Sequence, residues 1–523
     1  SWDRTRAYTV AGTQDRRQKG FTALTQLDGR AGTHHVVTAW LNGQQQHVNA
    51  ERLNAFNPLG TVPVFDRSVW GGALIDRAAF GTSTLETRLD ARHQDTSLEP
   101  SGTDAYMVGH DITRGSYFHT VDRHALAAQA SVVVSRVTTG LGGHHLFKAG
   151  TSVSYRKLKG WESGRPVTYV RSNGLPARIV EFAGPGSFDA DSTQVGAFAQ
   201  DGWEVADRVR VDAGFRFDHD TRVGTAAAPR VGVTWNVDAD TTVSAGGGWF
   251  TADTPLAALA FEGGLERRVT TFDEWGVATG PAVSYPNVES SDLDRPQARI
   301  WSGRVDRRLN NAWQLRVALQ ERRGTHNAIV TPSLINGQTV ALLSTTGESR
   351  TRSIETTVGY RPAGRPHQLY LSYVRSSSEG NTNDFGQVEG LFKDSRLAAA
   401  ELAPLPSDVP RRLLAWGVFQ LPLETTVAPF LDVRSGFPYS AIGDDWSYVE
   451  RRFERRYPLF ASLDLVVNKI VTLPGGMRAR VGFKLYNIAG RKNGRDVQAN
   501  VTSADFGDTY NPLGRQVRGV FEL

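Results

Sequence analysis

The stretch MRARVGFKLYN, residues 477–487, decides the fold because it alternates strictly between two kinds of side chain. Apolar residues occupy the odd positions from Met477 to Leu485, whereas arginine, glycine and lysine occupy the even positions from Arg478 to Lys484. A period of two residues places these two sets on opposite faces of a β-strand. The stretch therefore predicts a strand with one apolar face and one charged face.

Two neighbouring stretches repeat this pattern at the end of the chain. The segment PLFASLDLVVNK (residues 458–469) precedes the turn LPGG at 473–476, and the segment LGRQVRGVFEL (residues 513–523) closes the sequence. A membrane-crossing strand needs about 9–11 residues, whereas strands of soluble sheets average about 5–6. These segments have the greater length, and no helix is predicted beside them. Lipid is the simplest cover for their apolar face, with the charged face turned to a wet lumen.

The composition of the whole chain agrees with a membrane barrel. The 523 residues include no cysteine and no run of 18 apolar residues, so no transmembrane helix is predicted. A closed barrel can still span a membrane, because its strands satisfy each other's backbone groups. At roughly 24 residues per strand and loop, the fold class that we predict is all-β: an antiparallel transmembrane β-barrel of about 22 strands with short periplasmic turns and long extracellular loops.

Short turns and long connections largely alternate along the chain from Ala125 onward, as they do in outer-membrane barrels. The predicted tight turns, which should share one rim, are Gly140–Gly143, Val205–Asp207, Leu309–Asn311, Pro362–Pro366, Leu421–Leu423 and Leu473–Gly476. The predicted long connections, on the other rim, are Lys159–Ser192, Thr251–Gln297, Gly324–Thr351, Ser376–Arg411, Ser435–Tyr457 and Ile488–Pro512.

Further predictions concern individual regions of the wall. A first hairpin is predicted around Asp28–Arg30. Asp95–Arg123 is ambiguous locally, and we expect it to supply an extra pair of wall strands; the alternative is that the first wall strands lie upstream of Ser1 with a plug domain. Pro429 falls inside a predicted strand and should mark a bulge, because proline lacks a ladder donor. Closure of the barrel requires the last strand, Leu513–Leu523, to pair with the first strand near Arg4–Gly12.

The alternation also assigns side chains to the two faces of the wall. The residues predicted to face lipid are Val211, Phe215, Leu315, Val317, Leu369, Leu371, Val481, Phe483 and Leu485. The residues predicted to face the lumen are Arg210, Arg216, Gln314, Arg316, Arg478, Arg480 and Lys484.

Several short motifs, in their order and spacing, carry a family resemblance. They are FAQDGW at 198–203, AGFRFD at 213–218, APRVGVTW at 228–235, RGTH at 323–326, SDVPRR at 407–412, SGFPY at 435–439, the pairs at 463–464 and 468–469, YN at 486–487, and Asn493. The C-terminal two thirds of the chain thus resembles the barrel of a TonB-dependent outer-membrane transporter. It is most similar to the Oar-like receptors that carry a carboxypeptidase-regulatory-like domain. Two features depart from the family: no segment matches its plug, and Leu523 stands where an aromatic residue is usual.

The resemblance implies a place and a role. Residues 1–523 would form a single transmembrane β-barrel domain in the outer membrane of a Gram-negative cell, with the N-terminal plug and signal peptide outside this sequence. The protein would import a scarce ligand with energy coupled through the TonB complex, which acts on the plug. Implied partners are outer-membrane lipid and lipopolysaccharide, a small-molecule, oligosaccharide or peptide ligand, and possible surface or periplasmic partner chains. Nucleic acid is not expected, because no recognisable module for it is present.

No catalytic constellation, cofactor site or metal site is predicted. The glycine run Gly246–Gly248 lacks the lysine and the following helix of a phosphate loop, so it indicates a wall strand with close backbone packing. The adjacent pairs His34–His35 and His144–His145 would point to opposite faces of a strand, so neither pair can chelate a metal.

Two groups of loop residues are candidates for a ligand vestibule. Trp275, Tyr285, Trp446 and Tyr448 could stack against a ligand, or could instead belong to the interfacial girdle or to loop packing. Arg451, Arg452 and Arg455 could contact lipopolysaccharide phosphates or an anionic ligand. The alternative for these arginines is a solvated loop of mixed charge.

Three functions remain open from the residues alone. The first is a TonB-coupled transporter, the second a passive porin-like or structural barrel, and the third a soluble all-β enzyme or lectin. A plug of roughly one domain, about 100–150 residues, upstream of Ser1 would favour the first. A signal peptide directly before Ser1 would favour the second, and solubility without detergent the third.

Overall fold

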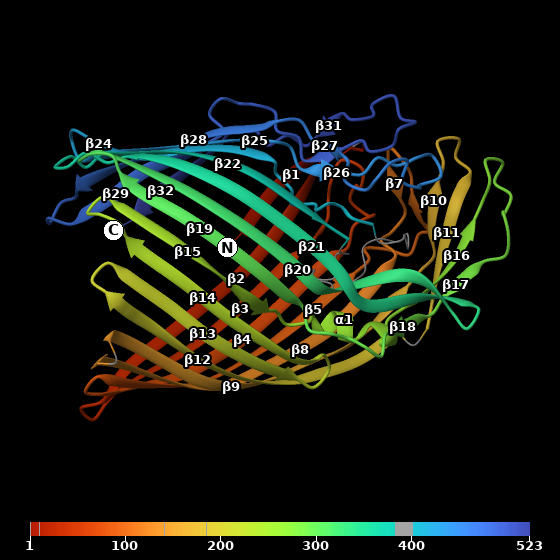
Figure 1. Cartoon of the computed structure of the whole chain (residues 1–523). Coiled ribbons are helices and arrows are strands. Elements are labelled where there is room, and N and C mark those ends of the chain that lie inside the picture. The colour runs from red at the N-terminus through yellow and green to blue at the C-terminus, as the bar shows by residue number, and fades with distance from the viewer. Residues whose placement is uncertain (1, 10, 141, 185, 382–400, 523) are drawn as a thin grey trace.

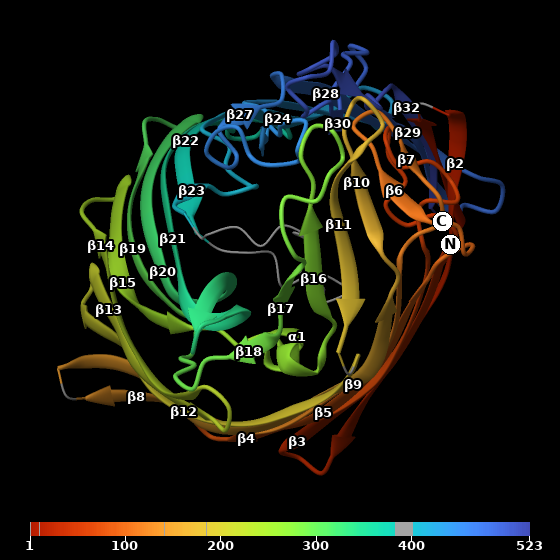
Figure 2. The same cartoon turned by 90° about the vertical axis from the view of Figure 1, so that its right-hand side faces the viewer.

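The computed structural model describes residues 2–9, 11–140, 142–184, 186–381 and 401–522. Strands dominate it, and one large antiparallel sheet rolls into the barrel seen from the side in Figure 1 and along its axis in Figure 2. In the described part, no helix has the length and hydropathy that a membrane-crossing helix requires. The predicted all-β antiparallel barrel is confirmed.

Twenty consecutive strands form the wall, each paired antiparallel with its neighbour in sequence. The large sheet has 22 strands in the described ranges, of which β18 (Asn287–Glu289) and β23 (Ala403–Pro404) are short additions beside β21 and β22. The wall strands are β1 (Trp2–Thr9), β2 (Gly12–Ala31), β3 (His35–Val48), β4 (Val64–Phe80), β5 (Ser83–Glu99), β8 (His119–Gly140), β9 (Gly143–Gly164), β12 (Ser187–Ala206), β13 (Val209–Asp220), β14 (Gly224–Asn236), β15 (Thr241–Thr251), β19 (Gln297–Arg308), β20 (Trp313–Ile335), β21 (Gln338–Tyr360), β22 (Gln368–Gly380), β24 (Arg411–Leu421), β25 (Thr425–Arg434), β28 (Phe460–Thr472), β29 (Arg478–Tyr486) and β32 (Gln516–Glu522).

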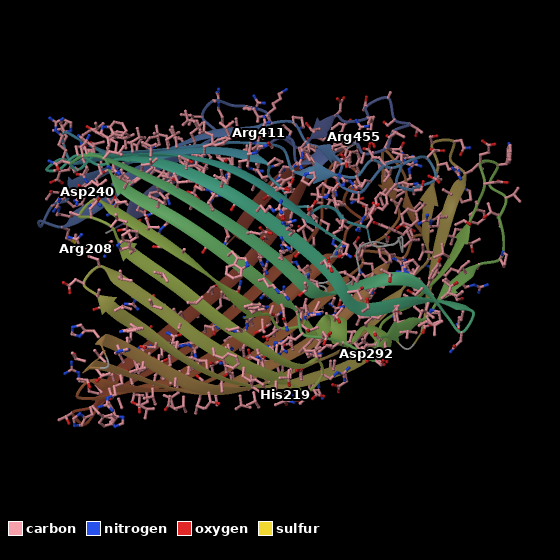
Figure 3. The ribbon with its side chains drawn as sticks, viewed as in Figure 1. Arg208, His219, Asp240, Asp292, Arg411 and Arg455 are labelled. Atoms are coloured by element: carbon pink, nitrogen blue, oxygen red, sulfur yellow. The ribbon has the colours of Figure 1, made fainter. Side chains whose placement is uncertain are left out.

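The six predicted tight turns all lie on one rim, because an even number of wall strands separates each from the next. That rim is on the left in Figure 1, and the long connections extend to the right. Figure 3 shows the same division in side chains, with Arg208 and Asp240 toward the short-turn rim and Asp292 and Arg455 toward the other. The rim of long connections also carries short turns, among them those at 221–223 and 336–337.

One predicted long loop, Gly324–Thr351, is instead the tip of a hairpin. Strands β20 and β21 continue through it and are joined by Asn336 and Gly337, whose φ angles are 50° and 79°. An Asn-Gly pair with two positive φ values is the commonest signature of a two-residue hairpin turn. The prediction was wrong because it overlooked this signature between two apolar segments.

Three smaller predictions also need correction. The first long hairpin turns at residues 32–34 rather than at Asp28–Arg30. The ambiguous segment Asp95–Arg123 supplies the ends of β5 and β8 and two short strands, but no extra pair of wall strands. Pro429 leaves a gap in the ladder between β24 and β25 with the register unchanged, so there is no bulge there. Its ring removes a hydrogen-bond donor without forcing an extra residue into the strand.

The glycine run lies in the wall, as predicted. Strand β15 pairs with β14 and β19 on its two sides, and a Cβ atom at Gly247 would overlap the ring of Trp301. Glycine at this position therefore lets the tryptophan lie flat against the neighbouring backbone.

The expected ladder between the last and first strands is not found among the described residues. There β32 pairs with β29 and β1 pairs with β2. These edge strands are the two shortest of the wall, with seven and eight residues. Viewed along the axis, both chain ends lie on the same side of the ring (Figure 2).

The two predicted faces of the wall are distinct. Large apolar side chains are exposed on the outer face, among them Phe215, Leu371 and Phe483, which is 55% exposed. The opposite face carries pairs of opposite charge, such as Arg210 with Asp212 at 2.8 Å and Arg316 with Asp306 at 2.6 Å. The pairing of β13 with β12, and of β12 with β9, puts Arg210 on the same face as Glu162, which contacts Leu265 of a long connection. The long connections fold into the ring (Figure 2), so this charged face is the inner one.

Candidate functional site

A second sheet lies across the mouth of the barrel at the rim of long connections. It has six strands in the order β17-β16-β11-β10-β6-β7 and is drawn inside the ring in Figure 2. We call it the mouth sheet. Its strands come from three separate connections: β6 (Tyr106–Val108), β7 (Thr113–Arg114), β10 (Val167–Val170), β11 (Pro176–Ala183), β16 (Glu266–Thr271) and β17 (Val283–Tyr285).

An apolar core attaches the mouth sheet to the inside of the wall. Phe65, Leu98 and Val121 occupy paired positions on three neighbouring wall strands and are at most 5% exposed. They pack with Tyr106 and Val167 of the mouth sheet. Burying a large apolar side chain contributes about 1.5–3 kcal/mol, so this core holds the mouth sheet firmly in place.

Polar contacts attach the connection 252–296 to the same inner face. Glu162 accepts a hydrogen bond from the backbone N–H of Leu265 at 2.8 Å, and His119 lies 3.3 Å from the same carboxylate. Farther along, Asp253 pairs with Arg295 at 2.8 Å and with Arg156 at 3.4 Å. The short helix α1 (Leu256–Leu259) is thereby held inside the barrel.

Trp446 lies against the mouth sheet from another connection, residues 435–459. It is 9% exposed, and its indole stacks on the ring of His110 with 4.5 Å between centroids and 10° between planes. The indole Nε1 donates a hydrogen bond to the carbonyl of Val170 in β10 at 3.0 Å. Trp446 thus joins three connections by packing.

Polar contacts around Trp446 bring in a fourth connection. Asp444 accepts a hydrogen bond from the backbone N–H of Ser172 at 2.8 Å and lies 3.2 Å from His110 Nε2. Asn500 donates to the carbonyl of Gly443 at 3.1 Å and also contacts His110. Gln498 donates to the carbonyl of His110 at 3.2 Å and accepts from the backbone N–H of Asn500 at 3.1 Å. We call the group His110, Asp444, Trp446, Gln498 and Asn500 the loop junction. Sequence reasoning missed its polar members because they come from three connections, and no local pattern links them.

The electrostatics of the junction favour neutral His110 and ionised Asp444. Burial lowers the pKa of His110, and the neighbouring Asp444 carboxylate only partly opposes this. Burial alone would raise the pKa of Asp444, but the hydrogen bonds from Ser172, together with the neighbouring His110 and Arg171 side chains, lower that pKa overall.

The other aromatic candidates are Trp275, Tyr285 and Tyr448. Trp275 is 72% exposed at the turn after β16, and Asn173 and Arg171 donate hydrogen bonds to the carbonyls of its neighbours Glu274 and Phe272. Since Ser172 also contacts the loop junction, the turn 171–175 connects Trp275 with the region of Trp446. Tyr285 in β17 packs on the apolar cluster that includes Phe261, and Tyr448 bridges to Ile442.

The three candidate arginines have carboxylate or carbonyl partners. Arg451 pairs with Glu454 at 2.7 Å and Arg455 with Glu450 at 2.6 Å, while both arginines stay half exposed. Arg452 is buried, and its backbone N–H donates to Glu401 at 3.2 Å. Arg451 and Arg455 therefore remain available to an anion, whereas Arg452 is committed to loop structure.

The pH dependence of the loop junction follows from His110. The pKa of His110 in the folded protein lies below the ordinary value of about 6.5, so below that pH the unfolded junction binds more protons than the folded junction does. Lowering the pH therefore destabilises the folded junction. We expect protease cleavage of residues 435–459 to increase as the pH is lowered from 7.5 to 5. His110→Gln should remove most of this increase, and an unchanged pH response in that variant would contradict the assignment. The variant retains His119, so the comparison isolates His110.

The chain matches a family model and many solved structures. Residues 101–488 match the family described as TonB dependent receptor-like, beta-barrel. The outer membrane transporter YddB of Escherichia coli is 14% identical with a TM-score of 0.70, and the alignment covers 98% of this chain and 69% of that one. A variant of the ferric enterobactin receptor PfeA of Pseudomonas aeruginosa is 12% identical with a TM-score of 0.68, covering 97% and 69%. The siderophore receptor PirA of Acinetobacter baumannii is 10% identical with a TM-score of 0.65, covering 97% and 70%.

These comparisons show the family and the fold of the chain. The chain spans about two thirds of the length of the solved proteins, and identities this low show a shared fold. A search of curated protein sequences found no match. The matches are to receptors and transporters of the outer membrane rather than to enzymes. The Oar-like subgroup is not confirmed by them.

Proposed function

Because the chain belongs to the TonB-dependent receptor-like β-barrel family of outer-membrane proteins, we propose that it is the wall and outer vestibule of an active-transport receptor. The receptor binds a scarce small-molecule, oligosaccharide or peptide ligand at the cell surface and imports it with energy supplied through TonB. Coupling requires a plug domain outside residues 1–523.

The observation that supports this proposal best is the inward-folded mouth sheet. A passive porin needs an open path, whereas here three connections build a sheet across the mouth and attach it to the lumen face with a buried core. Trp275, Arg451 and Arg455 remain exposed on this side and can stack on, or pair with, an arriving ligand. A restricted mouth with polar and aromatic groups suits selective capture.

Two measurements on the full-length gene product separate this function from a passive barrel. Reconstituted in liposomes, the coupled receptor should not let arabinose through, so the liposomes should not swell. The periplasmic domain of TonB should bind the purified protein in solution. Rapid swelling without TonB binding would establish the passive alternative.

Lipopolysaccharide is the lipid partner that we propose, and the outer wall offers a place for it. Glu321 is paired with Arg323 at 2.6 Å and with Arg350 at 2.8 Å, and Arg299 lies opposite Arg323. Glu321 itself lies opposite Trp301, whose side chain is 56% exposed on the outer face. Several arginines around one carboxylate leave a positive surface suited to phosphate groups.

Loss of these arginines should weaken lipid retention. We expect the double variant Arg323→Ala/Arg350→Ala to retain several-fold less lipopolysaccharide through purification than the wild type, because two phosphate partners are lost. The matched control is Arg451→Ala/Arg455→Ala in the loop, which should retain the wild-type amount. The reverse result would move the lipid contact to the loop arginines.

A further inference from the structure

Two histidines and one aspartate of neighbouring wall strands meet on the outside of the barrel. His93 and Asp95 are two residues apart on β5 and share a face, and Asp95 lies directly opposite His124 on β8. The Oδ1 atom of Asp95 is 2.8 Å from His93 Nε2 and 2.6 Å from His124 Nδ1. All three ligand atoms lie within 4.8 Å of one another.

The register places this group on the outer face. His93 lies opposite Trp70, whose side chain is half exposed, and Leu89 and Leu126 continue the same face as exposed apolar residues. Leu98, three residues after Asp95 on β5, lies on the opposite face and is fully buried under the mouth sheet. The group is therefore separate from the vestibule.

The group lies near the extracellular end of the wall strands. Strand β5 ends at Glu99 and β8 begins at His119, each within six residues of the group. The three side chains are 40–48% exposed. They therefore lie where water and lipid headgroups can reach them, above the apolar part of the exterior.

We propose that His93, Asp95 and His124 form a binding site for a divalent transition metal of the zinc type. Two imidazoles and one carboxylate are a common protein ligand set for such ions, with one or more coordination positions left to water or another small ligand. The open positions face outward, away from the lumen.

The geometry requires only a small adjustment. Ligand atoms about 2.0–2.2 Å from a tetrahedral ion are about 3.3 Å apart, so the carboxylate and the imidazoles must separate by roughly half an ångström. Half-exposed side chains reach that separation by small rotations about their own bonds. In the absence of an ion, Asp95 accepts hydrogen bonds from both rings.

A second carboxylate supports the site. The other ring nitrogen of His124, Nε2, lies 3.5 Å from Oδ1 of Asp122. Histidine ligands usually donate their second N–H to a carboxylate, which fixes the tautomer that leaves the first nitrogen free for the metal. Lys159 lies opposite His124 on β9, and its positive charge would repel a cation. The negative charges of Asp95 and Asp122 together exceed it.

A matched control exists on the same wall. His47 Nδ1 and Asp66 Oδ1 are 2.8 Å apart on neighbouring strands β3 and β4, also half exposed on the outer face. This pair has one imidazole instead of two. It therefore reports what an isolated histidine–aspartate pair contributes.

The test is a titration of the full-length protein, purified in detergent and stripped with EDTA, with Zn²⁺ followed by calorimetry. We expect one site of micromolar affinity in the wild type and in His47→Ala. His93→Ala and His124→Ala should each lose at least about 100-fold in affinity, and Asp122→Asn about 10-fold. Heat modifiability on a denaturing gel verifies that each variant barrel is folded.

Two outcomes would overturn the proposal. One is a folded wild-type protein that binds Zn²⁺ no more tightly than millimolar, which would make Asp95 a hydrogen-bonded bridge between two rings. The other is micromolar binding that persists in His93→Ala and His124→Ala, which would place the ion elsewhere. Neither outcome depends on transport, so the proposed function is tested separately.

Discussion

Replacing Phe483 with arginine is expected to lower the free energy of unfolding of the barrel by about 2–4 kcal/mol. Phe483 is 55% exposed on the outer face of β29, opposite Val467 on one side and Gly519 on the other. It lies about midway along the strand, where lipid covers the wall and a charge has no partner. The measurement is the denaturant midpoint of refolding into phospholipid vesicles.

The control is Arg480→Ala on the opposite face of the same strand. Arg480 pairs with Glu522 at 2.7 Å, and both side chains are more than half exposed. Such exposed pairs contribute about 0–1 kcal/mol, so the loss should be small. Equal losses in the two variants would contradict the assignment of faces.

Replacing Trp446 with alanine should destabilise the loop junction by about 3–5 kcal/mol, the usual cost of removing a buried tryptophan. The variant loses the stack on His110, the hydrogen bond to the carbonyl of Val170 and the edge contact with Tyr169 at 5.3 Å. Hydrogen exchange of residues 435–459 should become much faster, while the wall strands stay protected, because their ladders do not depend on this side chain.

Trp275→Ala is the matched control, since its side chain is 72% exposed. Surface substitutions usually change stability by at most about 0.5 kcal/mol, so loop exchange should stay near wild type. If both variants retain ligand import and only Trp446→Ala speeds hydrogen exchange in the loops, the role of the junction is to stabilise the loops rather than to bind ligand. Unchanged exchange in Trp446→Ala would show that the polar contacts alone hold the four connections.

The wall was predictable because its determinants are local. Each strand reports its own two faces through the alternation of side chains, as in residues 477–487, and each tight turn is marked by a few residues such as LPGG at 473–476. Strand ends were less predictable. Strand β9 continues to Gly164 and β21 begins at Gln338, because pairing with an already formed neighbour extends strands past the point where alternation fades.

The candidate site was less predictable because its groups come from distant segments. Trp446 and Trp275 are both aromatic residues in long connections, yet one is buried against His110 and the other is exposed. Nothing in the sequence near either tryptophan distinguishes them. The difference arises from which connection folds inward and which neighbour it meets there.

By itself, the sequence determined that this protein is built of long β-strands with one apolar and one charged face, because a period of two is a property of each strand alone. Tertiary structure decided which connections close the mouth and which side chains meet across strands. His93 and His124 are 31 positions apart, and only the register of β5 with β8 brings both to Asp95. Register depends on the pairing of whole strands, so no reading of one segment could have placed these three groups together.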